Sequence, residues 1–179
     1  MLAFLVQYNN VRFRSFPRRK ALFNFLAAPG FLGTRASVRS DLTLVLILFA
    51  AVLFTVGWQL AAHKRYEAHR WVQTSAVTLN AGVVLLSMVT SFVGRILPGI
   101  PAKLLEDSYG ITTVHALFGA ITVLFGVFVA LRGNSLVPKA WQFKNYKLFM
   151  RTAYVLYMLS TLGGVILYIS VYVFGTQPA

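Results

Sequence analysis

Four long, predominantly apolar blocks run along this chain, separated by short polar stretches. They cover about residues 42–62, 71–97, 111–131 and 149–174. Each block reaches the roughly 20 residues that a helix needs to cross a bilayer. Because the connectors are short and backbone groups in lipid must be satisfied within helices, consecutive helices should lie antiparallel. The pattern predicts an all-α membrane protein whose residues 41–179 form an up-and-down bundle of four transmembrane helices.

The first 40 residues contain no block of that length and are expected to form a separate basic arm. Residues 21–28 are apolar, but Pro29 and Gly30 end this run well short of a membrane span. Bases interleaved with phenylalanines suit a segment that lies in the headgroup layer. A tail bound to a partner explains the same pattern, so both alternatives stay open. The apolar stretch at 1–6 precedes its bases, which reverses the order found in a secretory signal.

The charge composition supports a membrane protein. Hydrophobic residues make up 58% of the chain and charged residues 12%, against roughly 25% charged residues in soluble domains. Lys and Arg number 17 against 4 acids, giving a net charge of +13. On a soluble chain this excess would indicate a nucleic-acid binder, but here the bases gather at the ends of the apolar blocks. We therefore expect docking to acidic partner surfaces or anionic lipids, and no nucleic acid. The expected docking residues are Arg12, Arg14, Arg18, Arg19, Lys20, Lys64 and Arg65.

The connectors differ in charge, and this difference predicts a topology. The first and third connectors, with the flanking helix ends, hold eight Lys and Arg, whereas the middle one holds Arg95 and Lys103. The positive-inside rule then places the first and third connectors in the cytoplasm and the arm, which has seven bases, outside. Bases close to the ends of spans have the largest effect on topology, so we base the expected topology on the connectors rather than on the arm.

All four acids lie at helix ends or in connectors: Asp41, Glu67, Glu106 and Asp107. This placement disfavours a pump or ion-coupled transporter, which needs ionisable groups inside the membrane. Asp41 is a plausible N-cap for the first span. The chain has no cysteine, which excludes thiolate chemistry and iron–sulfur ligation. No acid–base pair, activated nucleophile or metal motif stands out, so we expect neither an enzyme nor a metal site.

The three histidines, His63, His69 and His115, are the candidates for binding a cofactor such as haem b. Counting along antiparallel helices separates His69 from His115 by about 24 residues, or roughly 36 Å, which excludes one iron bound to both. His63 and His69 share the first connector's side, where they form a surface metal site or a haem edge, or else anchor a helix end. For His115 the alternatives are a functional group and a side chain hydrogen-bonded near Glu106 or Asp107. Whether any cofactor is bound stays open.

Four tyrosines of the last block lie close to one stripe of the predicted helix: Tyr154, Tyr157, Tyr168 and Tyr172. Helix packing explains such a stripe. A surface for haem, chlorophyll or quinone is the alternative.

Several of these residues resemble the CtaM-like membrane proteins, small four-helix proteins linked to cytochrome c oxidase assembly. The resemblance covers roughly residues 45–174. In the first half it rests on Gly57-Trp58, Lys64, Glu67, His69 and Thr74-Ser75-Ala76-Val77. In the second half it rests on Tyr109, His115, Gly119, Gly126, Gly164-Val165-Ile166-Leu167-Tyr168 and Tyr172.

The resemblance implies a role around haem-copper oxidases in a bacterial inner (cytoplasmic) membrane, and it puts His69 and His115 at the family's histidine positions. One departure bears on this. The family carries His-Arg-Lys just before its fourth helix, where this chain has Asn145-Tyr146-Lys147. If the family's histidine pair holds a metal or haem, this chain lacks half of it, and a structural role gains weight.

We therefore expect a non-catalytic membrane subunit or assembly factor of a respiratory or photosynthetic electron-transfer complex. It would act by helix packing and electrostatic docking. The alternative is a haem-b electron carrier or a quinone-reactive subunit that uses His63, His69 or His115.

Overall fold

The computed structural model describes residues 24–138, 141 and 145–175. The predicted docking residues from Arg12 to Lys20 lie outside the described residues. The described part contains four helices that are long and apolar enough to cross a membrane. Each span contains one α-helix, in the order α2 (Val38–Ala62), α3 (Tyr66–Val83), α4 (Asp107–Gly133) and α5 (Tyr146–Tyr168). The predicted four-helix membrane fold is therefore confirmed.

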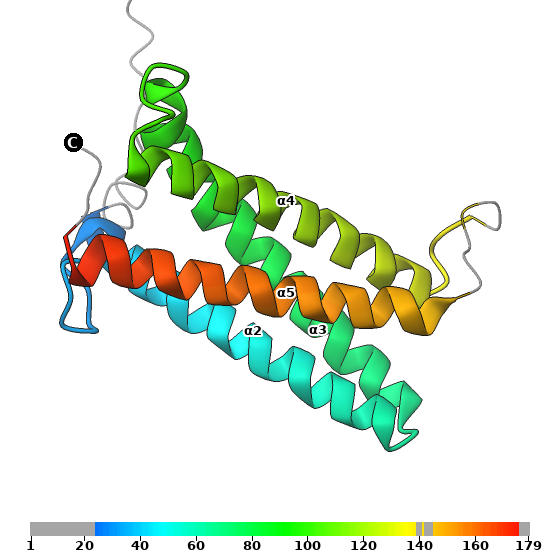
Figure 1. The fold of residues 1–179 in the computed structure, drawn as a ribbon. Helices are drawn as coiled ribbons and strands as arrows, with labels where there is room; N and C mark the ends of the chain where they lie inside the picture. Colours follow the sequence, from blue (N-terminus) through cyan, green and yellow to red (C-terminus); the bar gives the residue numbers. More distant parts are fainter. Residues whose placement is uncertain (1–23, 139–140, 142–144, 176–179) are drawn as a thin grey trace, which may run out of the picture.

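The four helices form two hairpins that cross each other (Figure 1). Helix α2 packs mainly on α3, and α4 mainly on α5. Helix α5 also returns along α2, so the last span lies beside the first (Figure 1). At one end of the bundle, the α2–α3 connection and the start of α5 stand apart in Figure 1. The two hairpins thus diverge towards the end that holds the first and third connectors.

Helix α2 begins four residues earlier than the apolar block predicts, and its N-cap is Ser37 rather than Asp41. The Ser37 hydroxyl accepts from the Ser40 backbone N–H over 3.4 Å, which satisfies one of the free donors at the helix start. Asp41 instead lies in the first turn with its side chain fully buried. The expected cap was wrong because a serine upstream of the apolar block takes that position.

Residues 28–37, the cap segment, fold back against the bundle. The loop closes through a hydrogen bond from the Gly30 N–H to the Ala36 carbonyl over 2.8 Å. It reaches the last span through Thr34 Oγ1, which lies 2.8 Å from the Tyr168 hydroxyl. The end of the predicted arm therefore contacts this chain's own helices.

The tyrosine stripe of the last span faces α2. The hydroxyl partners are Thr55 for Tyr154 (3.2 Å), the Ile47 carbonyl for Tyr157 (3.0 Å), Asp41 for Tyr168 (2.5 Å) and Ser40 for Tyr172 (3.0 Å). The Tyr157 ring also packs on Phe54, with ring centroids 4.2 Å apart, in the centre of the buried core. Phenol side chains can bury their rings in a bundle if the hydroxyl finds a partner. Packing of α5 on α2 thus accounts for the stripe.

The second span continues past α3 as two π-helical segments, η1 (Val84–Val89) and η2 (Phe92–Ile96), and one 3₁₀ turn, η3 (Leu97–Gly99). The fourth span ends similarly in η5 (Ile169–Val173). The Arg39 guanidinium crosses from α2 to η1 and donates to the carbonyls of Leu86 (3.1 Å) and Ser87 (2.6 Å), and to the Thr90 hydroxyl. This arginine ties the irregular part of the second span to the first.

Candidate functional site

A cavity of about 900 Å³ lies between the helices at the end of the bundle that holds the first and third connectors. All four helices contribute to its lining. Its volume is at the upper end of the roughly 300–1,000 Å³ range of small-molecule pockets. The two hairpins diverge around this space and stay in contact beside it through the Trp58 and Tyr154 rings, with centroids 4.8 Å apart, and through Asn134 and Thr74.

The cavity has an apolar interior and a charged mouth. Its interior includes Phe54, Trp58, Val77, Val129 and Met150. The charged residues of the lining are Lys64, Glu67, Arg70, Lys147 and Arg151, and all five are exposed. Four cations against one acid make the mouth electropositive. The cavity can therefore take a molecule with an apolar body and an acidic end.

His69 is part of this lining and has a defined tautomer. Its Nδ1 lies 2.7 Å from the Gly57 carbonyl oxygen, and a carbonyl can only accept a hydrogen bond, so Nδ1 carries the proton. In the neutral ring, the other nitrogen, Nε2, then has a free lone pair. Among the described residues, none bonds to that nitrogen. Histidines that ligate a metal are commonly oriented by such a bond to a carbonyl.

Gly57 also leaves room for Gln73, a second polar side chain of α3. A Cβ at Gly57 would lie 2.6 Å from Gln73 Nε2, which is closer than packed atoms come. The Gln73 amide donates to the Phe54 carbonyl over 3.2 Å. Two polar side chains of α3, Gln73 and His69, thus both reach backbone carbonyls of α2 beside the cavity.

Tyr146 and Lys147 line the same cavity as His69. The departure from the family's His-Arg-Lys sequence therefore falls at this site. The Tyr146 ring lies under the Arg132 guanidinium, 5.8 Å from ring centroid to Cζ. A cation at this distance from an aromatic face is attracted to it, so the pair closes the α4–α5 side of the cavity.

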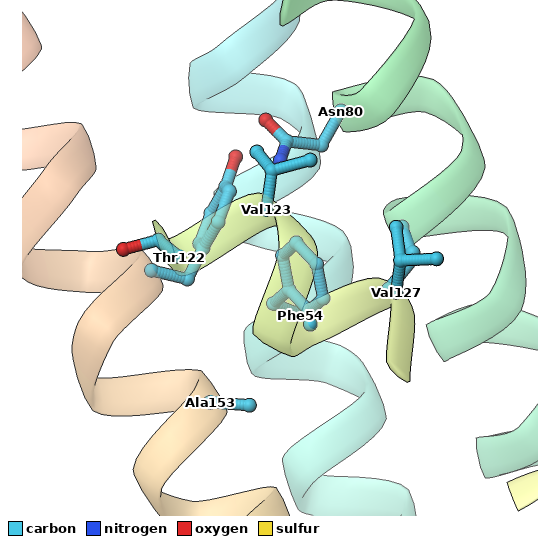
Figure 2. A pocket seen from close by; sticks show the side chains of 9 residues that line it. Phe54, Asn80, Thr122, Val123, Val127 and Ala153 are labelled. Atoms are coloured by element: carbon cyan, nitrogen blue, oxygen red, sulfur yellow. The ribbon is translucent and has the colours of Figure 1, made fainter. Parts of the chain in front are cut away.

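A smaller cavity of about 20 Å³ lies deeper in the bundle (Figure 2). It shares Phe54, Val77, Gly126 and Ala153 with the larger one, so it continues the same space inwards. Figure 2 shows the amide of Asn80 and the side chain of Val123 bordering it. Asn80 is only 8% exposed. The volume suits one water molecule, which would supply the amide with a polar partner.

The other two histidines lie away from this site. His63 is exposed, and its Nδ1 lies 2.8 Å from the Gln59 carbonyl oxygen. His115 packs on α5, where a Cβ at Gly163 would lie 3.2 Å from its Nδ1. The ring bonds to no described group, Glu106 included. The expected hydrogen bond to Glu106 is therefore not formed; the side chain of Asp107 lies outside the described residues.

His69 and His115 contact the bundle at different levels of α2. His69 meets α2 at Gly57, and His115 lies with the Ile47 side chain against Gly164. Gly57 and Ile47 are ten residues apart, or about 15 Å of helix. One iron still cannot join the two rings.

Sequence reasoning missed the amides of this region. Asn80 borders the small cavity, and the Asn134 side chain donates to Thr74 Oγ1 over 2.9 Å, which joins α4 to α3. Their signal was present, because an amide within or beside an apolar span needs a polar partner or a function. Among the described residues, no group of three His, Asp or Glu lies close enough together to hold a metal ion.

No protein family, curated protein or solved structure matched this chain.

Proposed function

We propose that this multi-pass membrane protein is a non-catalytic subunit or assembly factor of a respiratory or photosynthetic electron-transfer complex, and that it docks through its basic end. The observation that carries the docking role is the exposure of five bases at this end: Lys64, Arg65, Arg70, Lys147 and Arg151. One exposed acid, Glu67, accompanies them. Such a surface attracts acidic partner proteins and anionic headgroups.

The CtaM-like resemblance gives the class of partner. The residues that carry its first half gather at the cavity, because Trp58, Lys64, Glu67 and His69 all line it. Gly57 holds the His69 ring through its carbonyl. The first half of the resemblance thus concerns one spatial site, whereas His115, Tyr168 and Tyr172 of its second half lie elsewhere in the bundle. The shared site at the cavity supports a role near an oxidase.

Docking by charge accounts for partner choice, and helix packing accounts for attachment within the membrane. Complementary charge raises the rate of encounter and selects between partners. By the positive-inside rule, the basic end faces the cytoplasm of a bacterium, and the cap segment faces outwards. The acidic partner surface should then lie on the cytoplasmic side of the complex.

Charge reversal at the basic end tests this proposal. The protein would be purified through a C-terminal tag in mild detergent, and co-purifying subunits would be quantified by mass spectrometry. Lys64→Glu with Arg65→Glu should lower the affinity for partner subunits roughly 25-fold or more, because each lost base removes an attraction of about 1 kcal/mol near an acidic surface, or about fivefold. The recovery of partner subunits should fall accordingly. Arg95→Glu, an exposed base near the other end, is the matched control. Equal recovery from both variants would contradict docking through this end.

A haem-b carrier or quinone-reactive subunit is the second candidate, favoured by the free Nε2 of His69 in the cavity lining. Haem would supply one-electron chemistry when bound. His69 would hold its iron from one side, and bases of the mouth such as Lys147 and Arg151 would pair with its propionates. A reduced-minus-oxidised spectrum of the purified chain distinguishes this candidate, since the carrier shows a haem band that His69→Ala removes.

A further inference from the structure

We propose that the 900 Å³ cavity is a binding site for one anionic diacyl phospholipid. The acyl chains lie between the two hairpins, and the phosphate lies among the bases of the mouth. This inference rests on the proposed docking role in one respect only. Both take the basic end of the bundle as the surface that meets anions. Three properties of the cavity carry it: depth, lining and charge.

The depth of the cavity equals one leaflet. Along α3 its lining runs from Tyr66 to Val77, and along α2 and the residues that follow from Phe54 to Lys64. At 1.5 Å per residue, each wall is about 15 Å long. The hydrocarbon core of a bilayer is roughly 30 Å thick, so half of it is about 15 Å. A lipid of the leaflet at this end therefore fits the cavity lengthwise.

From the inner end of the cavity to its mouth, the lining changes from apolar to charged side chains, as a lipid changes from chain end to headgroup. The inner end is formed by Phe54, Val77 and Gly126, which offer carbon surface alone to a chain end. The intermediate level carries Trp58 and His69, whose rings combine an apolar body with a polar atom, and the polar side chains of Gln73 and Thr74. The outer end carries the exposed bases. An apolar space this large inside a membrane protein needs an apolar occupant, and the surrounding bilayer supplies one.

The charge of the mouth selects the headgroup. Lys64 follows α2, Arg70 lies on α3, and Lys147 and Arg151 lie one turn apart on α5. The bases thus stand on both hairpins, on opposite sides of the opening. A phosphate between them would bridge the diverging hairpins by charge-assisted hydrogen bonds. A zwitterionic lipid would bring a choline cation to the same bases and lose this advantage.

The test is native mass spectrometry of the full chain, first delipidated and then titrated in detergent with phosphatidylglycerol or phosphatidylcholine of equal chain length. We expect one phosphatidylglycerol per chain, with at least tenfold weaker binding of phosphatidylcholine. Glycerol phosphate should not compete, because it lacks the chains. Equal binding of the two lipids, or no lipid at all, would overturn the proposal.

Two variants test separately the charge of the mouth and the volume of the cavity. Lys147→Gln with Arg151→Gln should weaken phosphatidylglycerol binding roughly 25-fold, since each base near an anionic headgroup contributes about fivefold. Ala130→Phe fills the cavity from α4 and should abolish binding of both lipids while circular dichroism shows the same helix content. Arg65→Gln is the control, because Arg65 is an exposed base of this end that does not line the cavity. Unchanged binding in either cavity variant would overturn the proposal.

These outcomes separate the lipid site from the docking role. If Arg65→Glu lowers recovery of partner subunits while no lipid binds, the lipid site fails alone. If phosphatidylglycerol binds as expected while charge reversal at Lys64 and Arg65 leaves partner recovery unchanged, the docking role fails alone. Release of a haem with a visible band, in place of a lipid, would overturn the lipid site and support the carrier.

Discussion

The Tyr168 hydroxyl, at the end of α5, donates to the fully buried carboxylate of Asp41, in the first turn of α2, over 2.5 Å. The second carboxylate oxygen accepts from the Leu32 backbone N–H over 2.7 Å. One acidic side chain therefore joins the cap segment, the first span and the last span. A buried acid costs free energy unless donors surround it, so these bonds fix the N-terminal end of α2 in place.

Removing the phenol hydroxyl tests this relationship. Tyr168→Phe should destabilise the protein by about 1–3 kcal/mol, because Asp41 stays buried and loses a donor. Tyr172→Phe is the control, since Tyr172 bonds to the neutral Ser40 hydroxyl, and it should cost about 0.5–1.5 kcal/mol. Thermal unfolding in detergent measures both. Equal losses, or a larger loss for Tyr172→Phe, would contradict the importance of the Asp41 contact.

A second prediction concerns Gly30 in the cap segment. A Cβ there would collide with the Asp41 carboxylate and lie 2.8 Å from the Ala36 carbonyl oxygen. Gly30→Ala should therefore detach the cap segment, which limited proteolysis would detect as faster cleavage within residues 28–37. The control is Gly82→Ala, because nothing lies within 4 Å of a Cβ at Gly82. Unchanged protection of the cap segment in Gly30→Ala would show that it is not held against Asp41.

Arg39 should stabilise the π-helical part of the second span. Its guanidinium donates to carbonyls of η1, and Arg39→Gln removes those charge-assisted bonds. We expect faster amide exchange in residues 84–90, by about tenfold for a loss of about 1.4 kcal/mol, with α4 unaffected. Arg95→Gln changes an exposed base of the same span and serves as the control. Equal amide-exchange rates for residues 84–90 in the wild type and in Arg39→Gln would contradict this role of Arg39.

The topology can be measured directly because the chain contains no cysteine. Leu105→Cys, at a site 97% exposed in the middle connector, and Trp141→Cys, at a site 70% exposed in the third, place single thiols on opposite sides. An impermeant maleimide added to intact cells should label Leu105→Cys and spare Trp141→Cys, since the basic connectors should face the cytoplasm. The reverse pattern would place the basic end outside.

The fold was predictable because length and apolarity alone determine a membrane span. The helices nevertheless begin before the apolar blocks, since Ser37 and Tyr66 extend α2 and α3 into polar sequence. The π-helical segments were not predictable, because they depend on contacts such as that of Arg39 with Ser87, 48 positions apart in the chain.

The candidate site was predictable only in part. The bases Lys64 and Arg65 and the cavity residue His69 stood out by their types and by their place beside a span. The cavity could not be predicted, because it arises from the angle between the two hairpins, and residue types do not specify that angle.

The most direct test of the proposed function is one purified sample examined in three ways. The wild-type chain would be isolated in mild detergent through a C-terminal tag, and a native gel, subunit mass spectrometry and a visible spectrum would be recorded from the same material. We expect stoichiometric co-migration with a large electron-transfer complex, with no haem band contributed by this chain. A chain that migrates alone and carries a haem lost on His69→Ala would contradict it and establish the electron carrier instead.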